Sequence, residues 1–312
     1  MSFLKIKISG DGDDLNVSAE SDEDFEKEFT VSGKKKDILS RFNSIYDIIE
    51  NKKKDEYDSL KKDVKYLSGL FIEPIEDEVS DADKIRFIID YKLAKCAFDL
   101  LEADGKPIWL NSEVSYMVGE GEPEKEPELE LKTLFSISDV TADPERACKT
   151  ASDMFDDAEY YDMPKSKVKM LEELEKDVIL ISAHGELEDD LSGEIGINDE
   201  SITSDEMENV SAKLVYFDSC QQGVNTDFLE AFQEEETAQY YTSPITSNDA
   251  GDSSTKTMTW FFEDVLKNGN PVSAMANTRK KLYKFYTDKK LHELVVLNKA
   301  FIFRMYEFAS EE

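Results

Sequence analysis

Short apolar runs alternate with amphipathic stretches along most of this chain. The runs of strand length are Lys84–Asp90, Pro107–Leu110, Val114–Val118, Lys132–Ile137, Asp177–Ala183, Lys213–Asp218 and Gln239–Thr242. The helical patterns are near Glu145–Phe155, Ser166–Glu175, Ser204–Val210, Thr226–Glu234, Thr255–Lys267 and Val272–Tyr286. Strands that are almost wholly apolar and are separated by helices are typical of a parallel sheet covered on both faces. The pattern therefore predicts an α/β sandwich with a mostly parallel sheet.

The first part of the chain has a different pattern. Residues Phe3–Ile8 alternate between apolar and polar, which predicts a strand, and an acidic turn region is expected from Asp11 to Glu28. A helical pattern then extends from Lys36 to about Gly69. Farther along, Gly119–Glu130 is rich in Gly, Pro and Glu and predicts a solvated linker. We expect an N-terminal α+β cap over residues 1–60, a second part over 61–130 and a third over 131–312.

The chain has a strong excess of negative charge, with 70 acidic against 37 basic residues and a net charge of −33 over 312 residues. Nucleic acid is not an expected partner, because its phosphates would be repelled by such a surface. A basic protein or peptide would be attracted by the same field. The simpler interpretation of the charge is a highly soluble surface, and the two interpretations are compatible.

The three cysteines, Cys96, Cys148 and Cys220, do not suggest a disulfide framework. A reducing compartment fits them best, and we see no signal peptide and no apolar run long enough to span a membrane. We therefore expect a cytoplasmic protein without a membrane segment. The acidic clusters lack the spacing of a calcium loop, and there is no Gly-rich phosphate loop, so no metal or cofactor is expected.

The candidate chemistry lies at the ends of two apolar runs. One of the two histidines, His184, directly follows the run ending at Ala183, and Gly185 follows it. A second run ends at Asp218, and Ser219 and Cys220 follow. Because the carboxyl ends of parallel strands meet at one edge of a sheet, we expect the imidazole and the thiol to lie close together. Taken singly, each residue could instead be structural.

An imidazole beside a thiol is suited to acyl transfer through a cysteine nucleophile. A neighbouring imidazolium stabilises the reactive thiolate, and the imidazole can then protonate the leaving amine. The backbone N–H groups of Gly185 and Cys220 are candidates for an oxyanion site. The remaining cysteines and His292 are interpreted as packing and surface residues, respectively.

The order apolar strand, His-Gly, acidic turn, short helix, apolar strand, small residue, Cys resembles the caspase-like peptidase clan, which includes separases. The segment Leu191–Cys220 is similar to its CHAT branch, with Thr203, Asp205 and Glu206 at a helix start. Weaker similarity extends upstream to Ile85–Leu101 and downstream through Trp260–Phe262 and Pro271–Leu282. In all, the resemblance covers roughly Leu60 to Tyr286.

The resemblance implies a caspase-like three-layer sandwich and a protein-cleaving cysteine peptidase with His184 and Cys220 as its dyad. It also implies that the residues around Lys84–Val118 form an inactive upstream half, within part 61–130, and that 131–312 form the active half. Such proteases are held inactive until a protein partner, a ligand or self-cleavage releases them. A role in prokaryotic defence would follow by analogy with the family alone.

Acidic residues near the dyad predict after which substrate residue the enzyme cleaves. Asp249 and Asp252 follow the strand after Cys220, where the family builds its primary specificity pocket, and Asp218 is a third candidate. A carboxylate there would bind an Arg or Lys side chain. These residues are equally compatible with a simple turn, and an apolar Leu or Met preference stays open. Asp218 also departs from the family pattern, because its charge would disfavour a nearby thiolate.

Two other functions compete with the peptidase. The chain could be a catalytically silent caspase-like scaffold that docks a basic protein partner, or a different acyl-transfer enzyme at the same sheet edge. Replacing Cys220 by Ala separates the first from the other two, because a scaffold does not need the thiol.

Overall fold

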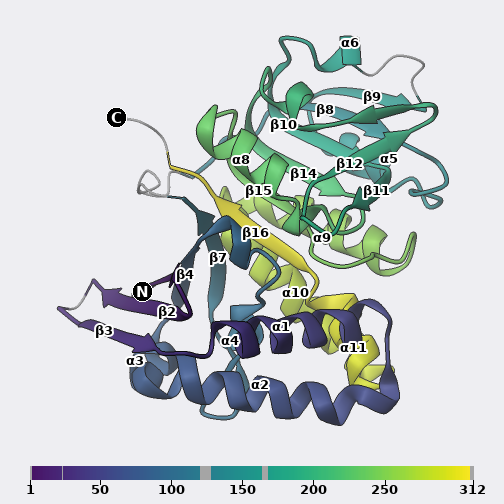
Figure 1. Ribbon diagram of the computed structural model, residues 1–312. Helices are drawn as coiled ribbons and strands as arrows, with labels where there is room; N and C mark the ends of the chain where they lie inside the picture. Colours follow the sequence, from purple (N-terminus) through teal and green to yellow (C-terminus); the bar gives the residue numbers. More distant parts are fainter. Residues whose placement is uncertain (1, 23, 120–127, 164–167, 310–312) are drawn as a thin grey trace. The chain divides into compact units, whose positions relative to one another are not determined.

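The computed structural model describes residues 2–22, 24–119, 128–163 and 168–309. The chain divides into two compact units (Figure 1). The N-terminal unit comprises Met1–Gly119 with His292–Asn298, and the C-terminal unit comprises Glu120–Leu291 with Lys299–Glu312. The expected parts 1–60, 61–130 and 131–312 stay a prediction. Residues 120–127 of the expected linker lie outside the described residues.

The N-terminal unit has strands in the order β3-β2-β1-β4-β7. β1 pairs antiparallel with β2 and parallel with β4, which pairs parallel with β7, while β2 pairs antiparallel with β3. The turn region expected from Asp11 to Glu28 is wrong, because it contains β2 and part of β3. Leu15, Val17 and Ala19 of β2 are buried at alternate positions with the polar residues Asn16 and Ser18 between them, a strand pattern that the acidic and polar residues on either side obscure. The strands are β1 (Phe3–Asp11), β2 (Asp14–Ser21), β3 (Glu26–Val31), β4 (Lys84–Ile89), β7 (Glu113–Val118) and the short pair β5 (Glu102–Ala103) and β6 (Lys106–Pro107).

Helices of the N-terminal unit pack through aromatic rings. Phe42 of α1 and Phe71 of α2 both contact Phe98, which stacks on Phe87 of β4. The strand predicted at Pro107–Leu110 is wrong: Ile108–Asn111 form helix α4, since a short apolar run does not distinguish a strand from a buried helix. The helices are α1 (Lys35–Glu50), α2 (Tyr57–Phe71), α3 (Glu76–Asp81) and α4. Helix α11 (Glu293–Ala300) begins in this unit and ends in the other.

The C-terminal unit is built on a mostly parallel sheet in the order β16-β15-β14-β10-β8-β9. Every adjacent pair is parallel except β15 with β16. The four strands predicted here from apolar runs are confirmed as β8, β10, β14 and β15. The strands are β8 (Thr133–Ser138), β9 (Asp157–Asp162), β10 (Glu175–Ser182), β14 (Ser211–Asp218), β15 (Ala238–Pro244) and β16 (Phe303–Glu307).

Two neighbouring residues of β14 show that helices cover both faces of this sheet. The Tyr216 ring packs against Phe261 and Phe262 of α9, whereas the Phe217 ring packs against Phe228 and Phe232 of α8. Successive side chains of a strand point to opposite faces, so α8 and α9 lie on opposite sides. The predicted three-layer α/β sandwich is confirmed.

The helices of the C-terminal unit are α5 (Ala147–Ser152), α6 (Val168–Leu171), α7 (Ser204–Met207), α8 (Thr226–Glu234), α9 (Ser253–Asn268) and α10 (Pro271–Asp288). All six fall within or close to the helices predicted from the sequence. Residues 166–167 of the predicted Ser166–Glu175 helix lie outside the described residues. Among the described residues, no helix combines the length and apolar character needed to cross a membrane.

Candidate active site

The paired strands β10 and β14 bring His184 and Cys220 to one edge of the sheet. These strands are parallel, and their last paired residues are Ser182 and Asp218. His184 and Cys220 each stand two residues beyond that pair. The side chain of His184 is exposed and that of Cys220 is half-buried. The register thus places these two residues at matching positions just beyond the ends of adjacent strands.

The backbone at Gly185 lies against the backbone at Cys220. A Cβ atom built on Gly185 would lie only 2.2 Å from the Cys220 carbonyl oxygen and 2.9 Å from its nitrogen. No side chain larger than hydrogen fits there without movement of the backbone. Gly185 belongs to β11 (His184–Leu187), which forms a small antiparallel sheet with β12 (Gly193–Ile197) and β13 (Glu200–Ile202). The glycine after the histidine therefore permits this hairpin to pack on the cysteine segment.

Gln222, which the sequence analysis did not single out, ties these two segments together. Its side chain is fully buried, and its Nε2 donates to the carbonyl oxygens of Glu186 at 3.1 Å and Cys220 at 3.2 Å. Its Oε1 accepts a 2.7 Å hydrogen bond from Asn225, the N-cap of α8. A buried amide with several partners rigidifies its surroundings, because each unpaired group would carry a desolvation cost. Gln222 thereby fixes the turn after Cys220 against β11.

Asp218 is buried close to the cysteine and is held by three side chains. Its Oδ2 accepts from Ser182 at 2.9 Å and from Ser254 at 2.6 Å, and its Oδ1 accepts from Asn248 Nδ2 at 2.7 Å. Burial raises the pKa of Asp218, and the charge of Asp143 adds to the rise, while the hydroxyl groups of Ser254 and Ser182 oppose it. The carboxylate is thus a buried acceptor at the sheet edge.

The loop after β15 reaches the cysteine through Asn248. The Asn248 backbone N–H donates to Cys220 Sγ over 3.4 Å, and the same residue binds Asp218 through its side chain. Asn248 directly precedes the candidate Asp249, but it was not singled out from the sequence. Its contacts join the thiol and the Asp218 carboxylate through one loop residue.

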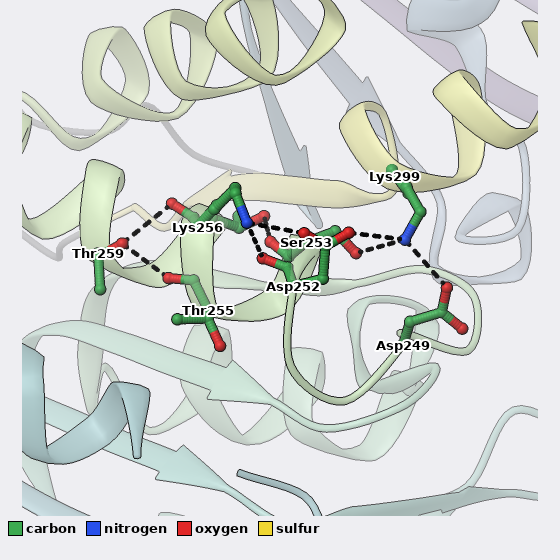
Figure 2. A network of polar contacts seen from close by, with 8 residues as sticks. Asp249, Asp252, Ser253, Thr255, Lys256, Thr259 and Lys299 are labelled. Carbon is green, nitrogen blue, oxygen red and sulfur yellow. Dashed lines mark hydrogen bonds and ion pairs between the residues drawn. The ribbon is translucent and has the colours of Figure 1, made fainter. Parts of the chain in front are cut away.

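Asp249 and Asp252 of the same loop form ion pairs with lysines (Figure 2). Lys299 Nζ lies 3.3 Å from Asp249 Oδ2 and 3.4 Å from Asp252 Oδ2, and Lys256 Nζ lies 2.7 Å from Asp252 Oδ1. Burial alone would raise the pKa of Asp252, but the hydrogen bond from Lys256 and the positive charges of Lys256 and Lys299 bring it to about 2. These two carboxylates are therefore paired with cations of the chain itself, in contrast to Asp218.

His184 contacts the side chain of Thr141, which is bonded to Asp139, and neither of these two residues was singled out from the sequence. His184 Nε2 lies 2.7 Å from Thr141 Oγ1, which in turn lies 2.7 Å from Asp139 Oδ1. Both residues follow β8, the strand next to β10, so they too stand at the carboxyl edge of the sheet. Their position just after an apolar strand was the one available sequence signal.

The remaining singled-out residues lie apart from this arrangement. Cys96 and Cys148 are buried, and burial raises the pKa of the Cys148 thiol well above its ordinary value. His292 is exposed and packs against Tyr57. Within the described parts of the chain, no group of three or more His, Cys, Asp or Glu side chains is arranged to hold a metal ion.

Comparison with known proteins shows a relationship in structure and not in sequence. No family model and no curated protein matches the chain. A chain of the Saccharomyces cerevisiae separase–securin complex matches with a TM-score of 0.57 at 9% identity, over 98% of this chain and 30% of that one. A second structure of that yeast complex matches at 9% identity over 72% of this chain and 16% of that one, with a TM-score of 0.42.

The chain thus spans about 30% of the length of the separase-complex chain that it matches. At 9% sequence identity, the similarity shows a shared fold alone. The mostly parallel sheet, its two helix layers and the separase match together show that this chain has a caspase-like, separase-like α/β fold.

Proposed function

We propose that this protein is a cysteine endopeptidase that cleaves a protein substrate, with Cys220 as nucleophile and His184 as its acid–base partner. The observation that carries the proposal is the packing of Gly185 on the Cys220 backbone at the edge where β10 and β14 end. That packing places a His-Gly segment and a cysteine at adjacent strand ends of a separase-like fold. The sequence similarity to the CHAT branch supports the further proposal that the enzyme is of CHAT type.

The proposed reaction proceeds by acyl transfer. The Cys220 thiol gives its proton to His184, and the thiolate attacks the carbonyl carbon of the scissile peptide bond. As the C–N bond breaks, His184 returns the proton to the leaving amine. Water then attacks the thioester with His184 as base, releasing the new carboxyl terminus and restoring the thiol. No metal or other cofactor takes part in this proposal.

The oxyanion that forms during attack requires donors at the same edge. We assign this role to the backbone N–H groups of Gly185 and Cys220. The assignment is supported by their proximity, because the Cβ position of Gly185 lies 2.9 Å from the Cys220 nitrogen. Two donors fixed by the protein backbone stabilise negative charge without reorganisation during the reaction.

Of the three acidic candidates, Asp218 has the surroundings best suited to bind a basic side chain. Asp249 and Asp252 already pair with lysines, whereas the three hydrogen-bond donors to Asp218 are neutral. A buried carboxylate without a cationic partner is stabilised by the arrival of a guanidinium or an ammonium group. We therefore propose cleavage after Arg or Lys, with an apolar preference as the alternative.

A regulatory protein partner forms part of the proposal. The matching structure is, by its title, a complex of separase with securin, which is a statement about those proteins. For this chain, control by a separate partner or by self-cleavage is proposed from that likeness and from the contact of Asn248 with the thiol.

Cleavage of a peptide library tests the proposal directly. The purified protein and its Cys220→Ala variant are incubated with peptides derived from a digested proteome, and new termini are identified by mass spectrometry. We expect cleavage after Arg or Lys by the wild-type protein and none by the variant. Identical products from both, or no new termini even after limited proteolysis of the protein, would contradict the peptidase.

The net charge of −33 and the contact of Asn248 with the half-buried thiol also favour one second function, a silent scaffold that docks a basic protein. The Cys220→Ala variant separates the two, because a scaffold would retain its partner and its cellular effect. Loss of the effect with retained binding would identify the enzyme.

A further inference from the structure

Asp139, Thr141 and His184 form a chain of hydrogen bonds next to the proposed nucleophile. The backbone N–H of Asp139 donates to the Ser182 carbonyl oxygen at 2.8 Å, which attaches the loop after β8 to the end of β10. Asp139 Oδ1 accepts from the Thr141 backbone N–H at 2.8 Å and from the Thr141 hydroxyl at 2.7 Å. The Thr141 hydroxyl also lies 2.7 Å from His184 Nε2. The loop thus holds one hydroxyl between a carboxylate and an imidazole.

Counting protons along this chain determines which nitrogen of His184 carries hydrogen. A threonine hydroxyl has one proton to donate and two lone pairs. The Thr141 proton goes to Asp139 Oδ1, which as a carboxylate oxygen can only accept. The contact with His184 must then be made by a hydrogen on Nε2 that the hydroxyl oxygen accepts. Neutral His184 is therefore the Nε2–H tautomer, with the lone pair on Nδ1.

We infer that Thr141, held by Asp139, is a positioning residue that selects the Nε2–H tautomer of His184 and leaves Nδ1 as its acid–base atom. The tautomer follows from the hydrogen bonds alone, whereas the catalytic role of Nδ1 rests on the proposed peptidase function. In that role Nδ1 takes the proton of Cys220 Sγ and later delivers it to the leaving amine. Nε2–H stays bonded to Thr141 in both protonation states, so the ring keeps its orientation through the cycle.

The tautomer can be measured without any enzyme assay, because the chain has only two histidines. The protein is labelled with ¹⁵N-histidine, and two-bond ¹H–¹⁵N correlation spectra are recorded about two pH units above the ordinary histidine pKa of about 6.5. His292 is an internal reference, since its Nδ1 accepts a 3.2 Å hydrogen bond from Leu294 N–H and it must also be the Nε2–H form. A His292→Gln variant assigns the signals.

We expect wild-type His184 to show a protonated Nε2 and an unprotonated Nδ1. Thr141→Ala removes the acceptor, and the nitrogen shifts of His184 should move towards those of a mixed population, while Thr141→Ser should restore the wild-type pattern. Asp139→Ala frees the Thr141 proton for donation to Nε2, so the Nδ1–H form should become populated. Thr150→Ala, which removes an exposed hydroxyl bonded to the Arg146 carbonyl oxygen, is the matched control and should leave His184 unchanged.

In the peptidase assay, Thr141→Ala should lower kcat about tenfold with little change in KM, as expected for loss of one hydrogen bond, and Thr141→Ser should recover most of it. A wild-type His184 with a protonated Nδ1, or a Thr141→Ala spectrum identical to wild type, would overturn the inference. A selected tautomer in a protein that cleaves nothing would leave the tautomer assignment and the positioning by Thr141 intact, and would reject the peptidase together with the acid–base role of Nδ1.

Discussion

The side-chain amide of Asn248 donates a 2.7 Å hydrogen bond to Asp218, the residue two positions before the proposed nucleophile. The backbone N–H of Asn248 also contacts Cys220 Sγ. One loop residue therefore occupies both groups that a basic substrate would engage: the carboxylate that would bind its side chain and the thiol that would attack its carbonyl. In the proposed mechanism, substrate binding would require Asn248 to move or to share its partners.

Replacement of Asn248 by Ala tests this competition. The variant frees Asp218 Oδ1 but keeps the backbone contact with the thiol, so a cationic group should pair with the carboxylate more readily. We expect Cys220 to react roughly fivefold faster with a peptidyl electrophile ending in Arg, and at an unchanged rate with one ending in Leu. A slower reaction with the Arg reagent would show that Asn248 helps to bind the substrate.

Single Asp→Asn replacements at positions 218, 249 and 252 test which carboxylate binds the basic side chain of the substrate. Loss of a charge-assisted hydrogen bond at Asp218 should slow labelling by the Arg reagent roughly tenfold to a hundredfold. Asp249→Asn and Asp252→Asn should change it little, because those side chains already pair with Lys299 and Lys256. A large effect at either of those two positions instead would place the specificity site on the loop.

Asp218 also predicts how stability varies with pH. Its pKa is raised in the folded protein, chiefly by burial, so the folded state binds its proton more tightly than the unfolded chain does. The contribution of this group to the free energy of unfolding is therefore greatest below the ordinary aspartate pKa and declines as pH rises through the folded-state value. Asp218→Asn should flatten that decline, measured by urea unfolding across the acidic range and compared with Asp249→Asn. If the difference in the free energy of unfolding between wild type and Asp218→Asn were the same at every pH, the raised pKa of Asp218 would be contradicted.

Two glycines of one hairpin, Gly185 and Gly196, provide a matched pair of substitutions that tests whether the close packing of the site is required. Gly185→Ala would bring its Cβ to 2.2 Å from the Cys220 carbonyl oxygen, whereas the nearest atom to a Cβ at Gly196 is the His184 carbonyl oxygen at 3.8 Å. We expect Gly185→Ala to destabilise the protein by about 1–3 kcal/mol and to abolish Cys220 labelling, because the backbone must shift. Gly196→Ala should retain labelling. Equal stability and equal Cys220 labelling of the two variants would show that the close contact between Gly185 and Cys220 is not required.

The parts of the fold that the sequence predicted are those with a strong local pattern. β10 and β14 are continuous apolar runs, and their ends located His184 and Cys220 directly. The strand β2 was missed because its buried residues are small in number and set among polar and acidic residues, and β3 was missed because nearly all of it is exposed. The apolar run predicted as a strand at Pro107–Leu110 forms helix α4 between β6 and β7.

The parts of the site that the sequence did not predict depend on contacts between distant segments. Thr141 reaches His184 across β8 and β10, and Lys299 reaches Asp249 from the far end of the chain. Gln222 looked like an ordinary residue after the cysteine, although its buried amide links two loops. None of these relationships has a local sequence pattern, because each arises from how the elements come together in the folded chain.

Intact-mass labelling of the purified protein tests the central claim most directly. Peptidyl electrophiles ending in Arg, Leu or Asp are compared on wild type and on His184→Ala, and the modified residue is located by peptide mapping. The account predicts selective modification of Cys220 by the Arg reagent and its loss in His184→Ala. Preference for the Leu reagent would keep the peptidase and reject the role of Asp218 in specificity. Absence of labelling by any reagent, or equal labelling of wild type and His184→Ala, would contradict a His184–Cys220 dyad.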